Sequence, residues 1–239
     1  MAKRLSAKGK KVPAYWSVSG YNNWRECAYR YMLQKVWKFK SPAHPAMERG
    51  IRIHKLFEEL LKGNVTGMPD ELVKLKKEIL NLKKHGGNPE EPWTLTKDLQ
   101  HTYPTDWNGA WLRAKLDAHH YWEDEAELLI VDLKTGRLKI TQSQMDLYAA
   151  MSPFYYPDAE DITVELWFSD HGEIESRHYT PKECKSLWKR WVKRSSDMLE
   201  DRKFLASPEK SKCDRCPMKS NKKLEDGRAG PCHEWKKAA

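Results

Sequence analysis

Apolar residues recur at helical spacing through the first third of the chain. Residues 20–38 carry aromatic side chains around much of their surface, which predicts a mostly buried helix. A second helix is predicted over residues 47–62. Its apolar positions, which we expect to face a core, are Met47, Ile51, Phe57, Leu60 and Leu61. A third helix over residues 70–84 ends at the stop signal His-Gly-Gly-Asn-Pro.

The apolar period changes from residue 93 onward. Alternating or continuous apolar runs, bounded by turn residues, predict three strands, a helix, two strands and a last helix. These elements are expected over residues 93–103, 109–122, 126–134, 141–152, 161–169, 173–179 and 181–202. Asp170-His171-Gly172 predicts a hairpin between the last two strands. The order of elements predicts an α/β (α+β) fold with a mixed central sheet flanked by helices.

The remaining segment, residues 203–239, is rich in Lys and Cys and shows no periodic apolar pattern. Something other than a hydrophobic core must therefore order it. We expect four parts along the chain: a basic, flexible N-terminus, a helical part with Cys27 and His54, a core of sheet and helices, and a Cys-rich tail. Their boundaries are residues 1–14, 15–90, 91–202 and 203–239.

The composition is polar but typical of a folded protein. Hydrophobic residues make up 39% and charged residues 32%, and the mean hydropathy is −0.85. The 11 Trp, 10 Tyr and 5 Phe argue against disorder. We see no apolar run long enough for a membrane span and no apolar stretch after the basic start, so we expect a cytoplasmic protein without a membrane partner.

Basic residues are concentrated at the two ends of the chain. The net charge is +9, the first 12 residues carry five bases and no acid, and residues 203–239 carry ten bases against five acids. Residues 182–202 are basic as well, so the centre of the chain is net acidic. Basic ends around an acidic centre suit a polyanion held over a carboxylate site, although basic tails that only aid solubility are an alternative.

Two aspartates and a lysine are the candidate catalytic residues. Asp117 is expected near the end of one strand, and Asp132 and Lys134 follow at i, i+2 on the next, so that their side chains share a face. Together they would form the minimal set for phosphodiester hydrolysis with a divalent metal ion. The alternative is a solvated strand edge, because Asp-x-Lys is frequent by chance.

Further polar residues lie on the helices before and after these strands. His54 follows Gly50 in a Gly-x-x-x-His pattern on helix 47–62. Gln144 and Tyr148 are four residues apart on helix 141–152, so their side chains share a helix face. Considered alone, His54 would be a core histidine satisfied by Glu58.

The series Gly-x-x-x-His, Asp, Asp-x-Lys-Thr-Gly and Gln-x-x-x-Tyr, in this order, resembles the RecB-like branch of the PD-(D/E)xK nuclease superfamily. The resemblance spans roughly residues 20–235. It implies a restriction-endonuclease-like core and a nuclease that depends on Mg²⁺ or Mn²⁺. Ala114 and Leu133 depart from the family pattern, where Gly and Tyr are frequent, but neither departure removes a ligand.

The same resemblance assigns roles to individual residues. The metal ligands it implies are His54, Asp117, Asp132 and the main-chain carbonyl of Leu133. Lys134 corresponds to the catalytic lysine. Gln144 and Tyr148 correspond to the residues that position this lysine and the DNA backbone.

Five cysteines without a secretion signal make a disulfide framework unlikely. Some RecB-like nucleases hold a 4Fe-4S cluster with one N-terminal and three C-terminal cysteines, and this sequence is similar in having Cys27, Cys213, Cys216 and Cys232. Four thiolates suit such a cluster or Zn²⁺, and metal bonds would order the polar tail. His233 is an alternative to Cys232, unligated thiols are the simpler alternative for all four, and Cys184 is expected to be an ordinary helix cysteine.

The helix over residues 182–202 interleaves bases with Trp188 and Trp191. We expect the tryptophans to pack inward and some of the charges to contact phosphates. The DNA-binding candidates are Arg137, Lys189, Arg190, Lys193 and Arg194.

These features predict a metal-dependent DNA exonuclease for single-stranded or frayed ends. Because the chain has no Gly-x-x-x-x-Gly-Lys phosphate loop, it is expected to act alone or with a helicase, recombination or CRISPR-adaptation protein. The rival hypotheses are a non-catalytic DNA-binding or scaffold protein on the same fold and a zinc-stabilised interaction module.

Overall fold

The structure is a computed structural model that describes residues 5–100, 109–139 and 141–238. The chain forms two compact units, one of residues 45–192 and one of residues 1–44 and 193–239. The boundary between them falls inside helix α6 (Pro181–Glu200). The expected flexible N-terminus begins with residues 1–4, which lie outside the described residues.

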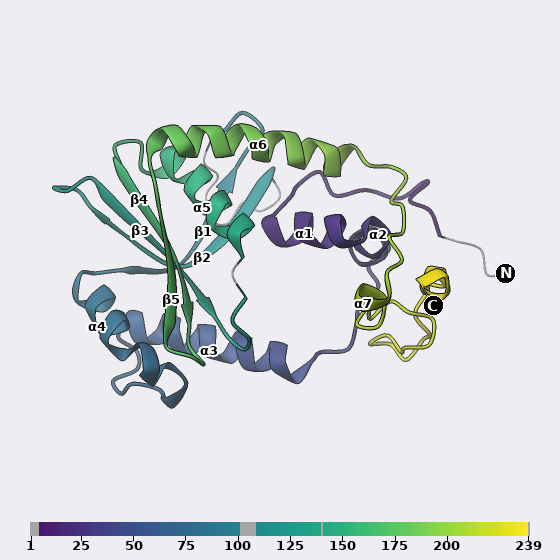
Figure 1. The fold of residues 1–239 in the computed structure, drawn as a ribbon, viewed down its shortest axis with the longest axis horizontal. Helices are drawn as coiled ribbons and strands as arrows, with labels where there is room; N and C mark the ends of the chain where they lie inside the picture. Colours follow the sequence, from purple (N-terminus) through teal and green to yellow (C-terminus); the bar gives the residue numbers. More distant parts are fainter. Residues whose placement is uncertain (1–4, 101–108, 140, 239) are drawn as a thin grey trace. The chain divides into compact units, whose positions relative to one another are not determined.

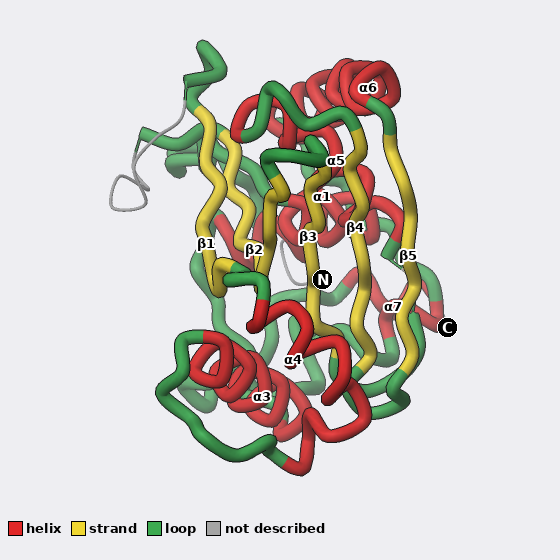
Figure 2. The backbone as a smooth tube through the Cα atoms, turned by 90° about the vertical axis from the view of Figure 1, so that its left-hand side faces the viewer, coloured by secondary structure: helices red, strands yellow, loops and turns green. Residues whose placement is uncertain are grey.

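The unit of residues 45–192 is built on a five-stranded sheet with the order β1-β2-β3-β4-β5 (Figures 1 and 2). The strands are β1 (Asn88–Leu95), β2 (Leu112–Trp122), β3 (Glu127–Lys134), β4 (Asp161–Phe168) and β5 (Glu173–Tyr179). β3 and β4 are parallel, and the other neighbours are antiparallel. The predicted mixed sheet with flanking helices is confirmed.

Helices pack on this sheet through alternate residues of its strands. Phe57 of α3 (Pro45–Leu61) belongs to a buried cluster with Val131 and Leu133 of β3, together with side chains of the 3-10 helix η1 (Asp70–Leu75) and of α4 (Lys76–Lys84). Asp132, between these two strand residues, accepts hydrogen bonds from α5 (Gln142–Tyr155). α3 and α5 therefore use opposite faces of β3.

The N-terminal part of α3 differs from the prediction. Phe57, Leu60 and Leu61 are buried as expected, whereas Met47 and Ile51 are each 61% exposed. The first turns of α3 are held by the polar contact of Arg49 with Asp170 and not by apolar packing. The expectation that Met47 and Ile51 face a core is wrong.

β1 also differs from the predicted strand over residues 93–103. It starts at Asn88 and contains Pro89 and Pro92, which a strand tolerates here because β1 is at the edge of the sheet. After Leu95 the chain turns, with the amide of Leu99 donating to Thr96 O at 3.1 Å. Residues 101–103 of the predicted strand lie outside the described residues.

The second unit contains two short helices where one helix was predicted over residues 20–38. α1 (Val18–Glu26) and α2 (Ala28–Lys35) are separated by Cys27, which has extended backbone angles (φ −162°, ψ 102°). Contacts distant in sequence set this break: Trp24 Nε1 donates to Asp201 Oδ2 at 2.8 Å, and the amide of Tyr29 donates to Leu205 O at 3.3 Å. Helical periodicity alone could not reveal them.

The tail has little regular structure, as its sequence predicts. It contains α7 (Lys210–Cys213) and the 3-10 helix η2 (Glu234–Ala238). A bridge between Lys219 and Cys232 and another between Lys223 and Ala229 tie it together. In the part of the chain that the structure describes, no helix has the length and apolar character needed to cross a bilayer.

Candidate active site

The site begins where β2 and β3 separate. Their pairing runs from Trp122–Glu127 to Ala118–Val131 and includes no further pairs. At the next position the carboxylate Oδ2 of Asp117 accepts a hydrogen bond from the amide of Leu133 at 2.7 Å. Asp117 is thus in the middle of β2, not near its end as predicted, but it marks the end of the pairing with β3.

His54 reaches this fork from α3. Its Nδ1 donates to Gly50 O at 2.8 Å, its Nε2 donates to Leu133 O at 2.9 Å, and Asp117 Oδ2 lies 3.2 Å from Nε2. Burial alone would lower the pKa of His54, but the hydrogen bond and charge of Asp117 and the carbonyl of Gly50 raise it to about 9. With both nitrogens facing acceptors the imidazole is protonated, and Nε2 would have to lose its proton to bind a metal ion.

Glu58 is not the partner of His54. Its carboxylate is bound by Lys55 and Lys62 of the same helix, and the hydrogen bond to Lys62 is the main cause that lowers its pKa. The alternative of a core histidine satisfied by Glu58 is wrong.

Gly50 and Arg49 hold α3 against the turn that follows β3. A Cβ on Gly50 would lie 3.2 Å from Thr135 Oγ1, a tight contact that the hydroxyl of Thr135 would have to relieve. The guanidinium of Arg49 donates to both oxygens of Asp170, at 2.5 and 2.9 Å. Asp170 also accepts from the amide of Gly136 at 2.6 Å. Sequence reasoning missed this positioning role, because Asp170 was recognised only as part of a hairpin turn.

Asp132, Lys134, Gln144 and Tyr148 form one network on the α5 side of the sheet. Lys134 is ion-paired with Asp132 Oδ2 and donates to Gln144 Oε1 at 2.7 Å. Gln144 Nε2 donates to Asp132 Oδ1 at 2.5 Å and lies 2.8 Å from the hydroxyl of Tyr148. The side chain of Gln144 therefore fixes the ammonium and the carboxylate relative to each other.

Burial and charge oppose each other at Asp132, which is 4% exposed. Burial raises the pKa of its carboxyl group, whereas the ammonium of Lys134 lowers it. Burial also raises the pKa of Tyr148 well above its usual value, so its hydroxyl remains a donor. It lies 3.0 Å from Lys115 O and 3.1 Å from Asp132 Oδ1.

The donor atoms at the fork suit a small divalent cation. An octahedral Mg²⁺ with ligands at about 2.1 Å has neighbouring ligand atoms about 3.0 Å apart. The separations from His54 Nε2 to Leu133 O and to Asp117 Oδ2, 2.9 and 3.2 Å, match this spacing. Asp132 Oδ2 is buried, and its partner among the described residues is the ammonium of Lys134.

The side chains are nevertheless bonded to one another and not arranged around a common point. Among the residues that the structure describes, no group of three or more His, Cys, Asp or Glu side chains forms a metal site. Asp132 is turned toward Lys134 and Gln144, which leaves His54 and Asp117 as the pair at the fork. The donor set fits a metal ion, whereas a complete ligand sphere is not formed.

The DNA-binding candidates lie on two separate elements. Arg137 is exposed in the turn after β3, and Lys189 and Arg190 are exposed on α6. Lys193 and Arg194 follow on α6 but belong to the other unit.

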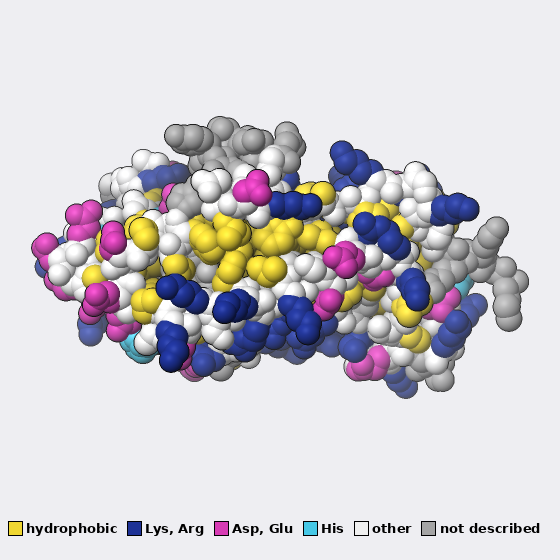
Figure 3. Space-filling model, turned by 90° about the horizontal axis from the view of Figure 1, so that it is seen from above, with side chains coloured by type: hydrophobic (Ala, Val, Ile, Leu, Met, Phe, Trp, Pro, Cys, Tyr) yellow, Lys and Arg dark blue, Asp and Glu magenta, His cyan; other side chains and the backbone are white. Residues whose placement is uncertain are grey.

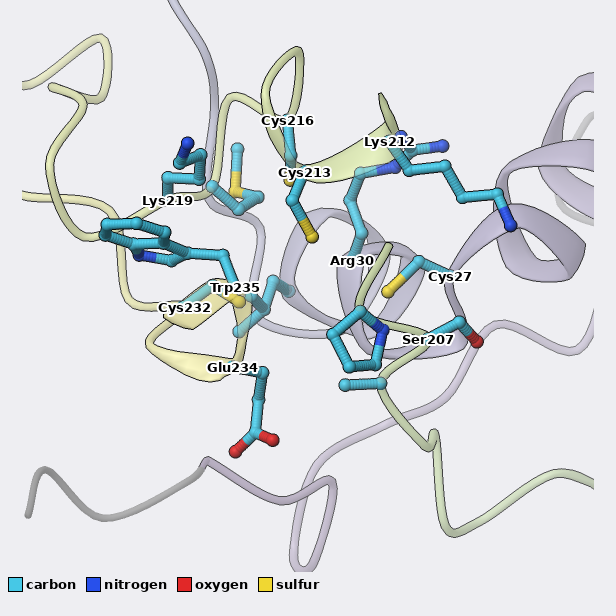
Figure 4. A pocket seen from close by; sticks show the side chains of 14 residues that line it. Cys27, Arg30, Ser207, Lys212, Cys213, Cys216, Lys219, Cys232, Glu234 and Trp235 are labelled. Carbon is cyan, nitrogen blue, oxygen red and sulfur yellow. The ribbon is translucent and has the colours of Figure 1, made fainter. Parts of the chain in front are cut away.

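The four cysteines of the predicted cluster line one pocket (Figure 4). Cys27 comes from the break between α1 and α2, and Cys232 is brought in by the bridge to Lys219. The cavity has a volume of about 30 Å³. Burial raises the pKa of Cys216 and raises the pKa of Cys232 to about 11.

Two alternatives for the cysteines can be judged from their positions. His233 is exposed and does not line the pocket, whereas Cys232 does. Cys184 is fully buried in the other unit, 3.9 Å from the hydroxyl of Ser152, and is an ordinary core residue as expected.

Comparisons with known proteins identify the family. The sequence profile of the PD-(D/E)XK nuclease superfamily matches residues 15–221, and the chain belongs to this superfamily. A solved structure of a candidate exonuclease from Eubacterium rectale is similar with a TM-score of 0.49 and 15% identity, over 78% of this chain and 80% of that chain. The structure of SSO0001 is similar with a TM-score of 0.42 and 11% identity, over 87% of this chain and 85% of that chain. No curated protein matches the sequence.

Proposed function

We propose that the protein is a divalent-metal-dependent DNA nuclease of the RecB-like branch. The observation that carries the proposal is the network in which Gln144 holds Lys134 and Asp132 together beside the fork with His54 and Asp117. A lysine paired with a buried carboxylate and fixed by an amide has a defined position, as a group that acts on a phosphate must have.

His54, Asp117, Asp132 and the carbonyl of Leu133 would hold Mg²⁺ or Mn²⁺. When bound, the cation supplies an activated water and neutralises charge on the phosphate. The ammonium of Lys134 would orient the attacking water and stabilise the charge that develops on the phosphate oxygens. Gln144 and Tyr148 keep Lys134 and Asp132 in register for this step.

The substrate we propose is a single-stranded or frayed DNA end, which the enzyme digests as an exonuclease. Arg137, Lys189, Arg190, Lys193 and Arg194 would contact its phosphates. The protein would act in the cytoplasm, in DNA recombination or repair, alone or with a helicase, recombination or CRISPR-adaptation protein. In the expected four-part division, residues 15–90 contribute His54 and residues 91–202 the remaining catalytic groups.

For Cys27, Cys213, Cys216 and Cys232 we propose a 4Fe-4S cluster, with Zn²⁺ as the alternative. The proposal is supported by their common pocket and by the polar sequence of the tail, which has little regular structure. Iron, sulfide and zinc analysis of anaerobically purified protein, together with its visible absorption, decides between the two. Apoprotein with four reactive thiols after anaerobic purification would contradict both.

The test of activity is digestion of end-labelled DNA with Mg²⁺, Mn²⁺ or chelator. Single-stranded and duplex substrates carry free or blocked termini, and wild type is compared with Lys134→Ala and with the exposed control Lys84→Ala. We expect metal-dependent digestion from free ends by wild type and by the control. Cleavage by Lys134→Ala would show that the active site is wrongly assigned. DNA binding without cleavage by wild type would favour the non-catalytic scaffold.

A further inference from the structure

Three aromatic rings form a cluster at the surface where α6 packs on α5. The ring of Trp188 lies 4.8 Å from that of Phe154 and 6.3 Å from that of Trp111, with interplanar angles of 63° and 76°. All three side chains are half-buried, whereas Trp191, one turn further along α6, is fully buried. The expectation that both tryptophans of α6 pack inward is therefore correct for Trp191 alone.

Basic residues lie directly beside this cluster. On α6, Lys185 and Val192 share the face of Trp188, and Lys189 follows Trp188 on the adjoining face. Val192 is 37% exposed, and both lysines are exposed. Figure 3 shows hydrophobic side chains gathered next to a row of Lys and Arg on the side of the molecule that α6 crosses.

Exposed bases of α6 in this unit have no ion-pair partner in the part of the chain that the structure describes. Lys182, Lys185, Lys189 and Arg190 are exposed and form no ion pair with any described residue. The neighbouring acid, Glu183, is engaged by Thr180, whose amide and hydroxyl donate to Glu183 Oε2 at 2.8 Å each. This contact is a capping box that starts the helix. The exposed face of α6 in this unit therefore presents positive charge that no described acidic residue pairs with.

We propose that Trp111, Phe154 and Trp188, with Lys185 and Lys189, form a binding surface for single-stranded DNA, which we call the aromatic platform. Aromatic faces stack on unpaired bases of any sequence, and lysines neutralise the phosphates between them. A duplex keeps its bases stacked inside, so the aromatic part of this surface selects single strands. The inference deepens the proposed nuclease function, on which it rests for the identity of the polyanion.

The platform and the catalytic network share helix α5. Gln144 and Phe154 are ten residues apart, which is about 15 Å along the helix axis. At the duplex spacing of about 3.4 Å per nucleotide this span corresponds to about four nucleotides, and an extended single strand covers it with fewer. Affinity should therefore rise with strand length until one strand reaches both places.

The test is binding of labelled oligo-dT of 3 to about 12 nucleotides and of a blunt duplex, by fluorescence anisotropy at several salt concentrations. The full-length Lys134→Ala protein is used so that no strand is cleaved. Trp188→Leu, which keeps apolar packing, should weaken dodecamer binding about tenfold or more. Trp188→Phe, which keeps an aromatic face, should retain most of the affinity. Equal affinities of the Leu and Phe variants would overturn the stacking role, even if both lowered stability.

Substitution of the lysines should change the salt dependence of DNA binding. Lys185→Ala with Lys189→Ala should lower the slope of log affinity against log salt by about 1.4, or about 0.7 for each phosphate contact on a single strand. Trp188→Leu should leave that slope unchanged. The matched controls are Lys77→Ala with Lys84→Ala on α4 and Trp122→Ala at the far end of β2, and both should bind like the parent.

The outcomes separate this proposal from the nuclease proposal. Binding of oligo-dT that depends on Trp188, in a protein that cleaves no DNA with any metal, would support the platform and refute the nuclease. Cleavage by wild type with binding indifferent to Trp188, Lys185 and Lys189 would refute the platform and leave the nuclease intact.

Discussion

The catalytic network and the four-cysteine pocket differ in what holds them together. In the network, Lys134, Asp132 and Gln144 are bonded to one another, and His54 is bonded to main-chain carbonyls. In the pocket, Cys27 and three cysteines of the tail gather around a cavity. The tail has short helices and two isolated bridges. Side-chain hydrogen bonds and an ion pair position the first site, whereas little regular structure surrounds the thiols of the tail.

The largest effect is expected for Lys134→Ala. It removes the charge beside Asp132, so cleavage should fall about 10³-fold, while DNA binding stays near that of wild type. Single-turnover cleavage and anisotropy measure the two quantities. If Lys134→Ala cleaved DNA at a rate within a few-fold of wild type, the network would stabilise the fold and would have no role in catalysis.

A smaller effect is expected for His54→Ala. Without the imidazole at the fork, the Mg²⁺ concentration that gives half-maximal cleavage should rise about 10- to 100-fold. Titration of cleavage with Mg²⁺ measures it, with Asp98→Asn as the exposed control. An unchanged metal requirement would remove His54 from the ligand set.

Cys213→Ser tests the four-cysteine pocket. Loss of a ligand should reduce the bound iron or zinc and lower the stability of residues 1–44 and 193–239 by about 2 kcal/mol or more. Metal analysis and limited proteolysis measure these changes. Cys184→Ala, in the other unit, should keep its metal; equal metal content in both variants would contradict the pocket as a metal site.

The smallest effect concerns His119 of β2, which is 1% exposed. Burial, with a smaller contribution from His120, lowers its pKa to about 4. A histidine whose folded pKa lies below the unfolded value stabilises the fold fully above pH 6.5 and progressively less as the pH falls toward 4. Between pH 7.5 and 5.5, wild type should therefore lose about 1 kcal/mol relative to His119→Gln.

Chemical unfolding of both proteins at the two pH values measures this difference and cancels contributions from other groups. Nε2 of His119 lies 2.7 Å from the hydroxyl of Tyr156 and 3.1 Å from Glu91 Oε2. If Glu91 held an imidazolium there, the sign of the difference would reverse. The stability of the unit of residues 45–192 would then depend on an ion pair between His119 and Glu91 and not on the burial of a neutral His119.

Local patterns were sufficient to predict much of this fold and site. The i, i+2 spacing places Asp132 and Lys134 together on one strand face, and the i, i+4 spacing does the same for Gln144 and Tyr148 on α5. The order of strands and helices from residue 109 to 200 follows from apolar period and turn residues, since each element buries one face.

Features set by distant contacts were not predictable in this way. The helix break at Cys27 depends on residues that follow α6, more than 170 positions later. Arg49 anchors the start of α3 through its hydrogen bonds to Asp170. Met47 and Ile51 are exposed there, although their spacing is that of a buried helix face. Neither contact leaves a periodic signal in the sequence.

The central claim is that residues from α3, β2 and β3 bind one divalent cation. Electron paramagnetic resonance measures Mn²⁺ binding to wild type, Asp117→Asn and Asp132→Asn. Each substitution keeps the size of the side chain and removes its negative charge. We predict a site in wild type that both substitutions weaken or abolish. Mn²⁺ binding of undiminished affinity in both variants would contradict the account.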